Sequence, residues 1–307
     1  MGRILALVIA AACILANAAA RVGTTRVAEG VYALQLPARG QGDDVLAPAR
    51  VTYIAGPRGV VVVDSGMSHL DGEAILATIR RATQAPVRLA ILTHPSQEAI
   101  FGATAFQERG IPVAMHRDAA ALVSARCGAC LQRLRTVLGD AAMGGTRVVV
   151  PDRLLEDDEV VHDAGRPLRI LAPPASSAPG AIAVLDERTG TLVAGSIVSI
   201  RAVPDLRDGS GSGWRAALDR LDRTRCVHLV PAYGSIGSCA DIAPLARYLD
   251  DLEQAVASLL AQGVDLGELD AKADLPAYAS WMRYSDLHRA NAARVYLRLE
   301  RAQLAHP

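Results

Sequence analysis

The sequence has no excess of charge of either sign, and it has almost no lysine. Its 307 residues include 32 basic and 32 acidic side chains, and Lys272 is the only lysine. Because phosphate binding needs a basic surface, this balance argues against nucleic acid as a partner. Outside its first residues the chain also lacks a run of about 20 apolar residues, so we expect no transmembrane segment in the mature chain.

The N-terminus is typical of an export signal. Arg3 precedes a short apolar run over residues 4–15, and small residues at 16–18 or 18–20 fit a cleavage site. We therefore predict a signal peptide over residues 1–20 and a periplasmic or secreted mature protein. A retained N-terminal anchor is the alternative.

Cysteine is scarce, and its spacing matters once export is assumed. Cys13 is removed with the signal peptide, which leaves Cys127, Cys130, Cys226 and Cys239. An oxidising compartment permits disulfides, and the chain has no second CxxC that would complete a four-thiolate zinc site. We expect two local bridges, Cys127–Cys130 and Cys226–Cys239, although four cysteines allow three pairings and a redox-active CxxC is the alternative.

Hydrophobic patterning predicts a layered fold with strands and helices in both halves of the chain. The expected strands cover residues 31–36, 50–54, 60–63, 87–92, 111–115, 147–150, 168–171, 181–185 and 191–194. The expected helices cover residues 70–82, 99–109, 214–221, 245–260 and a stretch from 278 to 300, and a further helix capped by Asp118 carries the CxxC. Periodicity alone indicates only a layered α/β or α+β fold. The two strand-rich halves, each followed by helices, suggest two mixed sheets face to face with helices outside.

The loop that follows strand 87–92 carries the strongest motif. It resembles the metal-binding turn of the metallo-β-lactamase superfamily, THxHxDHxxGA. His94 keeps the first ligand, whereas Ser96, Glu98 and Ala99 stand at the next three ligand positions. The resemblance implies an αββα sandwich over residues 21–243 and C-terminal helices over 244–307 packed on it.

The later ligand positions of the resembled family are also replaced. Ser177 stands where a His is usual, with Ser176 a near-equal choice, Ser196 stands at the bridging Asp, and Tyr233 stands at the last His. Catalytic zinc sites use three protein ligands and a water, and neutral hydroxyls are poor zinc ligands. The resemblance therefore implies a degenerate metal site in which only His94 remains a strong ligand. We expect no cofactor, or zinc only if a site has been rebuilt.

Two arrangements could restore chemistry to this pocket. His69 and His116 follow strand ends near the motif and could join His94 and Glu98 in a relocated metal site. Ser96, Ser177, Ser196 and Tyr233 could instead converge in a metal-free hydrolase pocket, with His94 as the base and Glu98 orienting it, although no GxSxG elbow is present. The resemblance also implies that Asp64 supports the metal-binding loops from beneath.

Within the superfamily the chain resembles the exported quinoprotein relay system zinc metallohydrolases. The CxxC, the helix that begins at Trp214, and the pair Trp281 and Asn291 in the tail carry this resemblance. It implies a setting near pyrroloquinoline quinone dependent alcohol oxidation, with a quinoprotein dehydrogenase or cytochrome as partner.

Three interpretations follow from these residues. The first is a non-hydrolytic binding or accessory protein that holds a small-molecule ligand in the former metal pocket. The second is a metal-dependent hydrolase of an ester, lactone or lactam built around His94. The third is a disulfide-stapled protein whose helical tail binds a partner.

Overall fold

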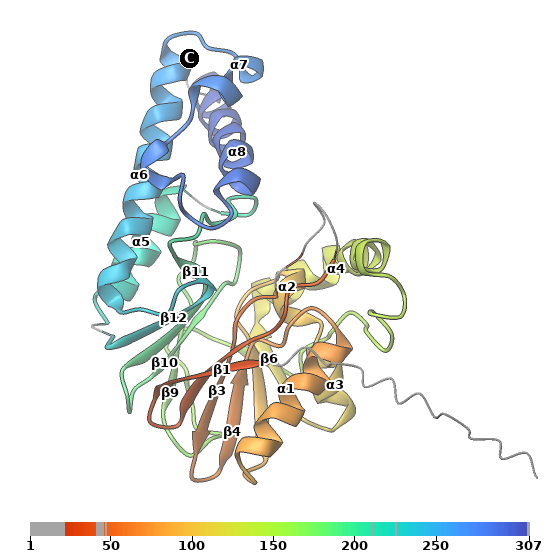
Figure 1. The fold of residues 1–307 in the computed structure, drawn as a ribbon. Helices are drawn as coiled ribbons and strands as arrows, with labels where there is room; N and C mark the ends of the chain where they lie inside the picture. Colours follow the sequence, from red (N-terminus) through yellow and green to blue (C-terminus); the bar gives the residue numbers. More distant parts are fainter. Residues whose placement is uncertain (1–21, 41–45, 47, 210, 225, 306–307) are drawn as a thin grey trace, which may run out of the picture.

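A computed structural model describes residues 22–40, 46, 48–209, 211–224 and 226–305, so the predicted signal peptide lies outside the described residues. Two β-sheets face each other, and helices lie on the outer side of each sheet (Figure 1). The predicted sandwich with a C-terminal helical extension is confirmed. No helix of the described residues has both the length and the apolar character needed to cross a bilayer.

The first sheet has seven strands in sequence order. They are β1 (Gly23–Ala28), β2 (Val31–Gln35), β3 (Val51–Gly56), β4 (Gly59–Val63), β5 (Val87–Leu92), β6 (Val113–His116) and β7 (Arg153–Leu155). Pairing is antiparallel from β1 to β4 and parallel from β4 to β7. Four helices accompany this sheet, α1 (His69–Ala82), α2 (Gln97–Ile100), α3 (Ala103–Glu108) and α4 (Arg117–Leu138). The parallel half therefore directs the ends of β4, β5 and β6 to one edge.

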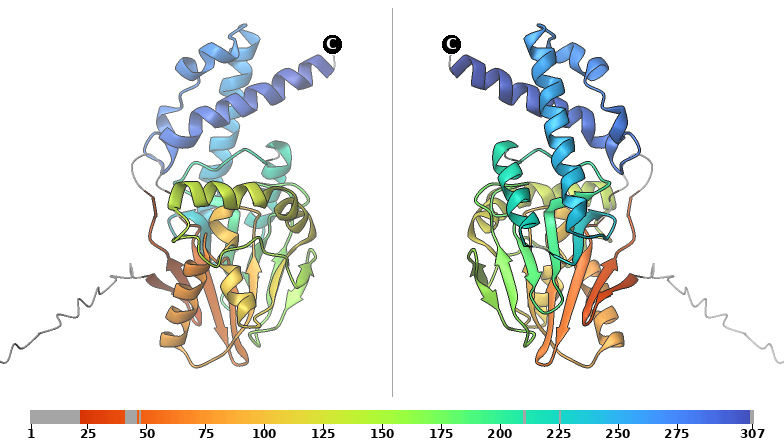
Figure 2. Two further views of the ribbon diagram at one scale, coloured as in Figure 1. Left: turned by 90° about the vertical axis from the view of Figure 1, so that its right-hand side faces the viewer. Right: turned by 90° about the vertical axis from the view of Figure 1, so that its left-hand side faces the viewer.

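The second sheet has five strands in the order β12-β11-β10-β9-β8. They are β8 (Val160–Val161), β9 (Leu168–Leu171), β10 (Ala183–Asp186), β11 (Thr191–Ile200) and β12 (His228–Gly234). Its helices are α5 (Gly211–Asp222), α6 (Ile242–Ala261), α7 (Leu266–Lys272) and α8 (Tyr284–Ala305), with the short 3-10 helices η2 (Cys239–Asp241) and η3 (Pro276–Tyr278). Figure 2 shows that α6, α7 and α8 extend beyond one end of the sandwich.

Alternation along β4 explains how both faces of the first sheet are covered. Val60 and Val62 pack in the same cluster as Ile75 of α1, whereas Val61 and Val63 pack in the cluster between the two sheets. Successive side chains of a strand point to opposite faces, so a continuous apolar run is buried on both. The run of valines therefore places β4 in the middle of the fold.

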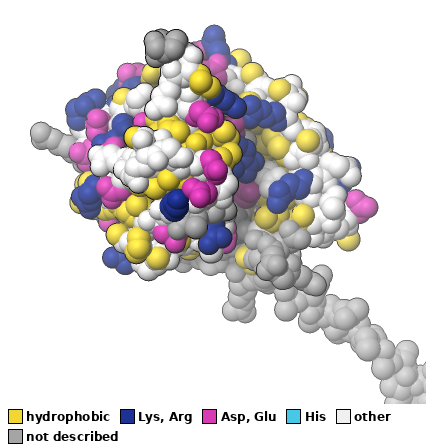
Figure 3. Space-filling model, turned by 90° about the horizontal axis from the view of Figure 1, so that it is seen from above, with side chains coloured by type: hydrophobic (Ala, Val, Ile, Leu, Met, Phe, Trp, Pro, Cys, Tyr) yellow, Lys and Arg dark blue, Asp and Glu magenta, His cyan; other side chains and the backbone are white. Residues whose placement is uncertain are grey.

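The C-terminal helices share a core with the second sheet. Tyr248 of α6 and Val295 of α8 belong to the same buried cluster as Ile197 of β11. Asn291 of α8 is fully buried, accepts a hydrogen bond from Leu206 N (3.1 Å) and donates one to Pro204 O (2.7 Å). Viewed from the end that carries these helices, basic and acidic side chains are interspersed with apolar ones (Figure 3), as a formal net charge of zero leads one to expect.

Three local predictions were wrong. The predicted helix over 99–109 is divided into α2 and α3, because Gly102 packs so closely on Ser65 that a Cβ there would lie 1.8 Å from Ser65 O. Residues 147–150 form no strand, and the sheet continues instead with β7. Asp118 does not cap α4: the cap is His116, whose ring nitrogen Nδ1 accepts a hydrogen bond from Asp118 N (3.3 Å).

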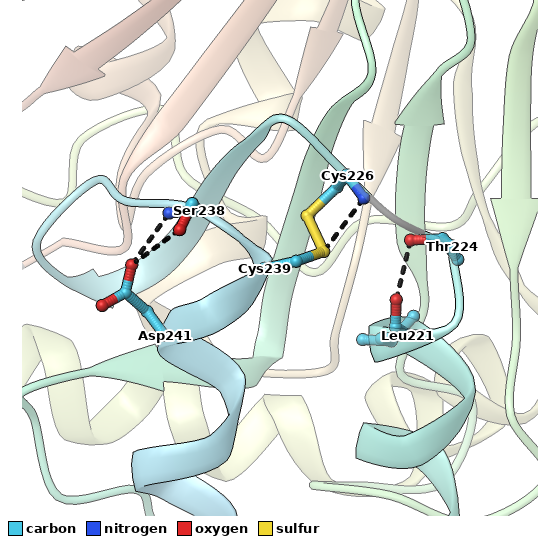
Figure 4. The surroundings of a disulfide bond; sticks show 6 residues. All are labelled: Leu221, Thr224, Cys226, Ser238, Cys239 and Asp241. Carbon is cyan, nitrogen blue, oxygen red and sulfur yellow. Dashed lines mark hydrogen bonds between the residues drawn. A yellow bond between two sulfur atoms is a disulfide. The ribbon is translucent and has the colours of Figure 1, made fainter.

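One of the two predicted disulfides is present. Cys226 and Cys239 are bonded (2.05 Å), and they join the segment just before β12 to η2, near the end of α5 and the start of α6 (Figure 4). The predicted Cys127–Cys130 bridge is wrong for this structure, in which both residues are free thiols. They lie one turn apart on α4, which already fixes their separation, so no covalent bond is needed to hold this segment.

Candidate functional site

Asp64 ends β4 and ties it to the loop after β5. It is 1% exposed, and its carboxylate accepts hydrogen bonds from Thr93 N (2.8 Å) and from the Thr93 hydroxyl (2.8 Å). Burial raises the pKa of Asp64 to about 7, and the two hydrogen bonds from Thr93 oppose this rise. The carboxyl group therefore fixes the residue that precedes His94.

His94 continues this chain of hydrogen bonds. Its Nδ1 lies 2.7 Å from the Thr93 hydroxyl, and burial lowers the pKa of His94 to about 4, so the ring is neutral at pH 7. When Asp64 is ionised, Thr93 donates its single hydroxyl proton to the carboxylate and accepts from Nδ1–H. Nε2 then carries a lone pair, and this buried atom has no hydrogen-bond partner among the described residues.

Tyr233 and Ser96 lie next to His94. The Tyr233 ring contacts the His94 ring edge-on, with 6.2 Å between centroids, and the Tyr233 hydroxyl is 3.4 Å from the Ser96 hydroxyl. Ser96 also donates a hydrogen bond to the Glu98 carboxylate. Burial raises the pKa of Tyr233, and the negative charge of Glu98 raises it further, so Tyr233 is a neutral phenol at neutral pH. The structure thus brings together four of the residues that the sequence placed in the pocket.

The second sheet contributes Ser177 and Ser196. Their hydroxyl oxygens are 2.8 Å apart, and Gly195 approaches Thr93 so closely that a Cβ on Gly195 would lie 2.5 Å from the Thr93 hydroxyl. Ser176, the alternative to Ser177, is buried and its hydroxyl has no partner among the described residues. The serine pair therefore belongs to the same edge of the sandwich as the His94 loop.

Ala99 supplies backbone alone at its position. It is fully buried in α2, and its carbonyl accepts hydrogen bonds from the backbone N–H and the hydroxyl of Ser65 (both 2.8 Å). A methyl group cannot ligate a metal or bind a polar ligand, so this position serves the fold.

The predicted relocated metal site is not assembled. His69 pairs with Glu108 of α3 (2.7 Å between Nε2 and Oε2), and His116 is used as the cap of α4. No group of three or more His, Cys, Asp or Glu side chains that could hold a metal ion occurs among the described residues. The four-residue set of His69, His94, His116 and Glu98 is therefore wrong as a single site, because two of its members are committed to other partners.

Zinc does not fit the donor set at the expected pocket. His94 offers one nitrogen, and the Glu98 carboxylate already accepts a hydrogen bond from Ser96. The remaining positions carry hydroxyl groups, and a tyrosine whose pKa is raised stays protonated. A hydrolytic zinc needs three good protein ligands and a water, so the residues present do not supply a zinc coordination sphere.

Two contacts at this site carry no signal in the sequence. Thr93 links Asp64 to His94. In the sequence, nothing except its position inside the motif could have suggested this role. Arg283, 50 residues after Tyr233, places its guanidinium 4.9 Å from the centre of the Tyr233 ring. This cation–π contact shows that the segment before α8 covers part of the site.

The chain was compared with protein families, solved structures and curated proteins. Residues 46–226 match the profile of the metallo-beta-lactamase superfamily. A metallo-beta-lactamase from Pontibacter korlensis aligns with a TM-score of 0.63 at 18% identity, covering 75% of this chain and 99% of its own. A search of curated proteins finds no match.

Two further solved structures have the same fold. The DIM-1 metallo-beta-lactamase aligns with a TM-score of 0.61 at 13% identity, covering 75% of this chain and 97% of its own. The FIM-1 metallo-beta-lactamase from Pseudomonas aeruginosa, in its mono-zinc form, aligns with a TM-score of 0.59 at 13% identity, covering 75% of this chain and 95% of its own. At such low identities the similarity establishes the fold alone.

Proposed function

This chain belongs to the metallo-beta-lactamase superfamily, and we propose that it is a binding or accessory protein whose former metal pocket holds a small hydroxylated molecule without hydrolysing it. The observation that carries the proposal is the His94 Nε2 atom, which is buried without a hydrogen-bond partner among the described residues. Around it the usual ligand positions carry hydroxyl groups, as in Ser177 and Ser196. Buried polar atoms are normally hydrogen-bonded, so an orphaned one beside several hydroxyl groups favours a ligand that satisfies it.

The polar groups of the pocket select for a ligand that donates hydrogen bonds. The neutral His94 ring offers a lone pair at Nε2, and the Glu98 carboxylate is a further acceptor. The hydroxyls of Ser196 and Tyr233 can donate or accept. A diol can donate to both acceptors and accept from a hydroxyl, and an alcohol can donate to one of them, whereas a carboxylate ligand would be repelled by the charge of Glu98. Short alcohols and diols are therefore the first ligands to test.

Calorimetric titration of the mature protein with alcohols and diols of two to six carbons tests the proposal. Ser196→Ala and Tyr233→Phe each remove one hydroxyl, and each should weaken binding by about 2-fold to 10-fold, the effect of one net hydrogen bond. Ser285→Ala, which removes an exposed hydroxyl from α8, is the matched control and should bind as the wild type does. Binding that none of the pocket substitutions changes would contradict the proposal, as would the absence of binding across the series.

The zinc content of the purified protein distinguishes the proposed binding protein from a metal-dependent hydrolase. Elemental analysis of the mature protein, produced with ample zinc and purified without chelator or His tag, should give zinc well below one equivalent per chain. About one equivalent that is lost in His94→Ala would overturn the proposal. That result would support the alternative of a metal-dependent hydrolase of an ester, lactone or lactam.

We also propose that the protein acts in the periplasm beside pyrroloquinoline quinone dependent alcohol oxidation. The support is the resemblance to the quinoprotein relay subgroup, and a disulfide is compatible with an oxidising compartment. Deletion of the gene should slow growth on alcohols while leaving growth on sugars unchanged, and the protein should fractionate with the periplasm. Co-purification with a quinoprotein dehydrogenase or cytochrome tests the partner, and unaltered alcohol oxidation in the deletion strain would count against this setting.

A further inference from the structure

Two free thiols lie side by side on α4. The sulfur atoms of Cys127 and Cys130 are 3.1 Å apart, within hydrogen-bonding distance. Helix geometry places Cα atoms three residues apart at about 5 Å, which falls inside the range of roughly 4.4–6.8 Å that a disulfide spans. The pair can therefore be linked without unwinding the helix.

The two sulfur atoms differ in their access to solvent. Cys127 lies on the buried stripe of α4 with Val123 and Leu134 and is 1% exposed, whereas Cys130 lies at the margin of the stripe and is partly exposed. An incoming disulfide can therefore reach Cys130 and not Cys127. This is the arrangement of an attacking cysteine with a resolving cysteine behind it.

The charges around the pair favour the same division of roles. The hydrogen bond between the two thiols lowers the pKa of Cys130 to about 7, with help from the Arg207 guanidinium and against burial and the charge of Glu98. The same hydrogen bond and burial raise the pKa of Cys127. A thiol whose pKa lies near the ambient pH combines a useful thiolate fraction with good nucleophilicity. Cys130 is therefore the better nucleophile of the two.

One of the two residues between the cysteines eases closure of a bond. Gly128 is exposed in the middle of α4, and a Cβ added there would meet no atom within 4 Å. Packing therefore does not require a glycine at this position. Its backbone freedom lowers the cost of the small adjustment that a covalent bond between the flanking residues demands.

We propose that Cys127 and Cys130 form a redox-active dithiol that exchanges with a low-molecular-weight disulfide. The Cys130 thiolate attacks one sulfur of the disulfide R–S–S–R, forms a Cys130–S–S–R mixed disulfide and releases R–S⁻. Cys127 then gives up its proton and attacks the Cys130 sulfur, which forms the Cys127–Cys130 bond and releases the second R–S⁻. The dithiol is oxidised by two electrons, and one external disulfide is reduced to two thiols. The proposal is independent of what the His94 pocket binds.

Reaction of the reduced mature protein with oxidised glutathione tests this assignment by mass spectrometry of the peptide that holds both cysteines. The wild type should lose two hydrogen atoms and retain no glutathione. Cys127→Ser should trap one glutathione on Cys130, because the resolving thiol is gone. Cys130→Ser should react at least about tenfold more slowly, since the remaining thiol is buried and protonated. The Cys226–Cys239 bond serves as an internal reference.

A matched control separates a tuned thiol from an exposed one. Ser124→Cys, made in the Cys127→Ser/Cys130→Ser background, places a single thiol on an exposed position of the same helix. Cys130 in the wild-type protein, where the Cys127 thiol is present, should react several times faster than this introduced thiol. An equal or slower rate would overturn the proposal. So would a wild-type protein that keeps glutathione instead of closing the internal bond. Circular dichroism of each variant establishes that it is folded before the rates are compared.

Discussion

A single hydroxyl proton links three residues at the edge of the sandwich. The Thr93 hydroxyl lies between the Asp64 carboxyl and the His94 ring and can donate to only one of them at a time. Ionised Asp64 accepts a hydrogen bond from this hydroxyl and leaves Nε2 as an acceptor, whereas protonated Asp64 lets Thr93 donate to Nδ1 and makes Nε2–H a donor. Because burial raises the pKa of Asp64 to about 7, the pocket exchanges acceptor for donor near neutral pH.

Replacing His94 should change how stability depends on pH. As the pH falls from 6.5 to about 4, unfolded His94 takes up a proton and folded His94 does not, so acid favours unfolding. Asp64 acts in the opposite sense, because its folded pKa of about 7 lies above the ordinary 3.8 and the folded state binds the proton first. The two contributions nearly cancel in the wild type between pH 4 and 6.5.

In His94→Gln only the Asp64 contribution remains, so the variant should gain stability as the pH falls from 7 to 4. Relative to this variant, the wild type should lose about 3 kcal/mol of unfolding free energy between pH 6.5 and 4, from 1.36 kcal/mol for each pH unit. Urea unfolding at several pH values measures both curves, with His162→Gln as the control for loss of an exposed histidine. Parallel curves for wild type and His94→Gln would show that His94 is not buried in its neutral form.

At the scale of elements, one amide fastens the C-terminal helix to the rest of the protein. Asn291→Ala leaves Leu206 N–H and Pro204 C=O without their partner and should lower the free energy of unfolding by about 3 kcal/mol, since each unsatisfied group costs about 1–3 kcal/mol. Gln303→Ala, on an exposed turn of the same helix, should change it by less than about 0.5 kcal/mol.

Denaturant unfolding measures both variants, and hydrogen exchange at the Leu206 amide reports the local effect. When the denaturant concentration is adjusted so that the two variants have equal global stability, the Leu206 amide should exchange faster in Asn291→Ala than in Gln303→Ala. A loss of stability no greater than that of Gln303→Ala would mean that the apolar contacts of α8 hold the helix without the amide.

Elements with strong hydrophobic patterns could be predicted from the sequence, whereas an exposed edge strand and a break in a helix could not. The uninterrupted run over Val60–Val63 predicts a buried strand, and α6 follows from its spacing of apolar residues. The edge strand β1 is mostly exposed and its Thr and Arg residues carry no alternating pattern, so it was not predicted. The break between α2 and α3 depends on the close approach of Gly102 to Ser65, which only the tertiary structure reveals.

Some residues of the candidate site could likewise be located from the sequence, and some of its contacts could not. The motif register located Ser96 and Tyr233, which the fold brings within 3.4 Å of each other, because short flanking motifs fixed their positions. The contact of Arg283 with Tyr233 depends on how the tail packs and leaves no local trace. The spacing of Cys127 and Cys130 fits either a bridge or a thiol pair, and their placement on one helix permits both. In the structure their sulfur atoms lie 3.1 Å apart and are not bonded.

At the scale of the whole molecule, one buried guanidinium joins the two sheets at the end of β10. Arg166 pairs with Asp186, and its Nη1 donates to Glu29 O (3.1 Å) in the turn between β1 and β2 and to Ala55 O (3.0 Å) of β3. Its side chain is 3% exposed and that of Asp186 is fully buried. A fully hydrogen-bonded pair of this kind holds the sheets in one relative position. Removal of either charge leaves the other charge buried without its partner.

Arg166→Met should therefore cost about 3–5 kcal/mol, because it leaves the Asp186 carboxylate buried without its partner. Arg166→Met/Asp186→Leu should recover much of that loss, since replacing both charges by apolar groups removes the desolvation penalty. Trp214 packs against β11 in the second sheet, so its fluorescence follows that half while far-UV circular dichroism follows the whole chain. Because the pair bridges both sheets, the two signals should shift together to lower urea. If circular dichroism alone shifts while the fluorescence midpoint stays in place, the sheets unfold separately and the Arg166 contacts do not couple them.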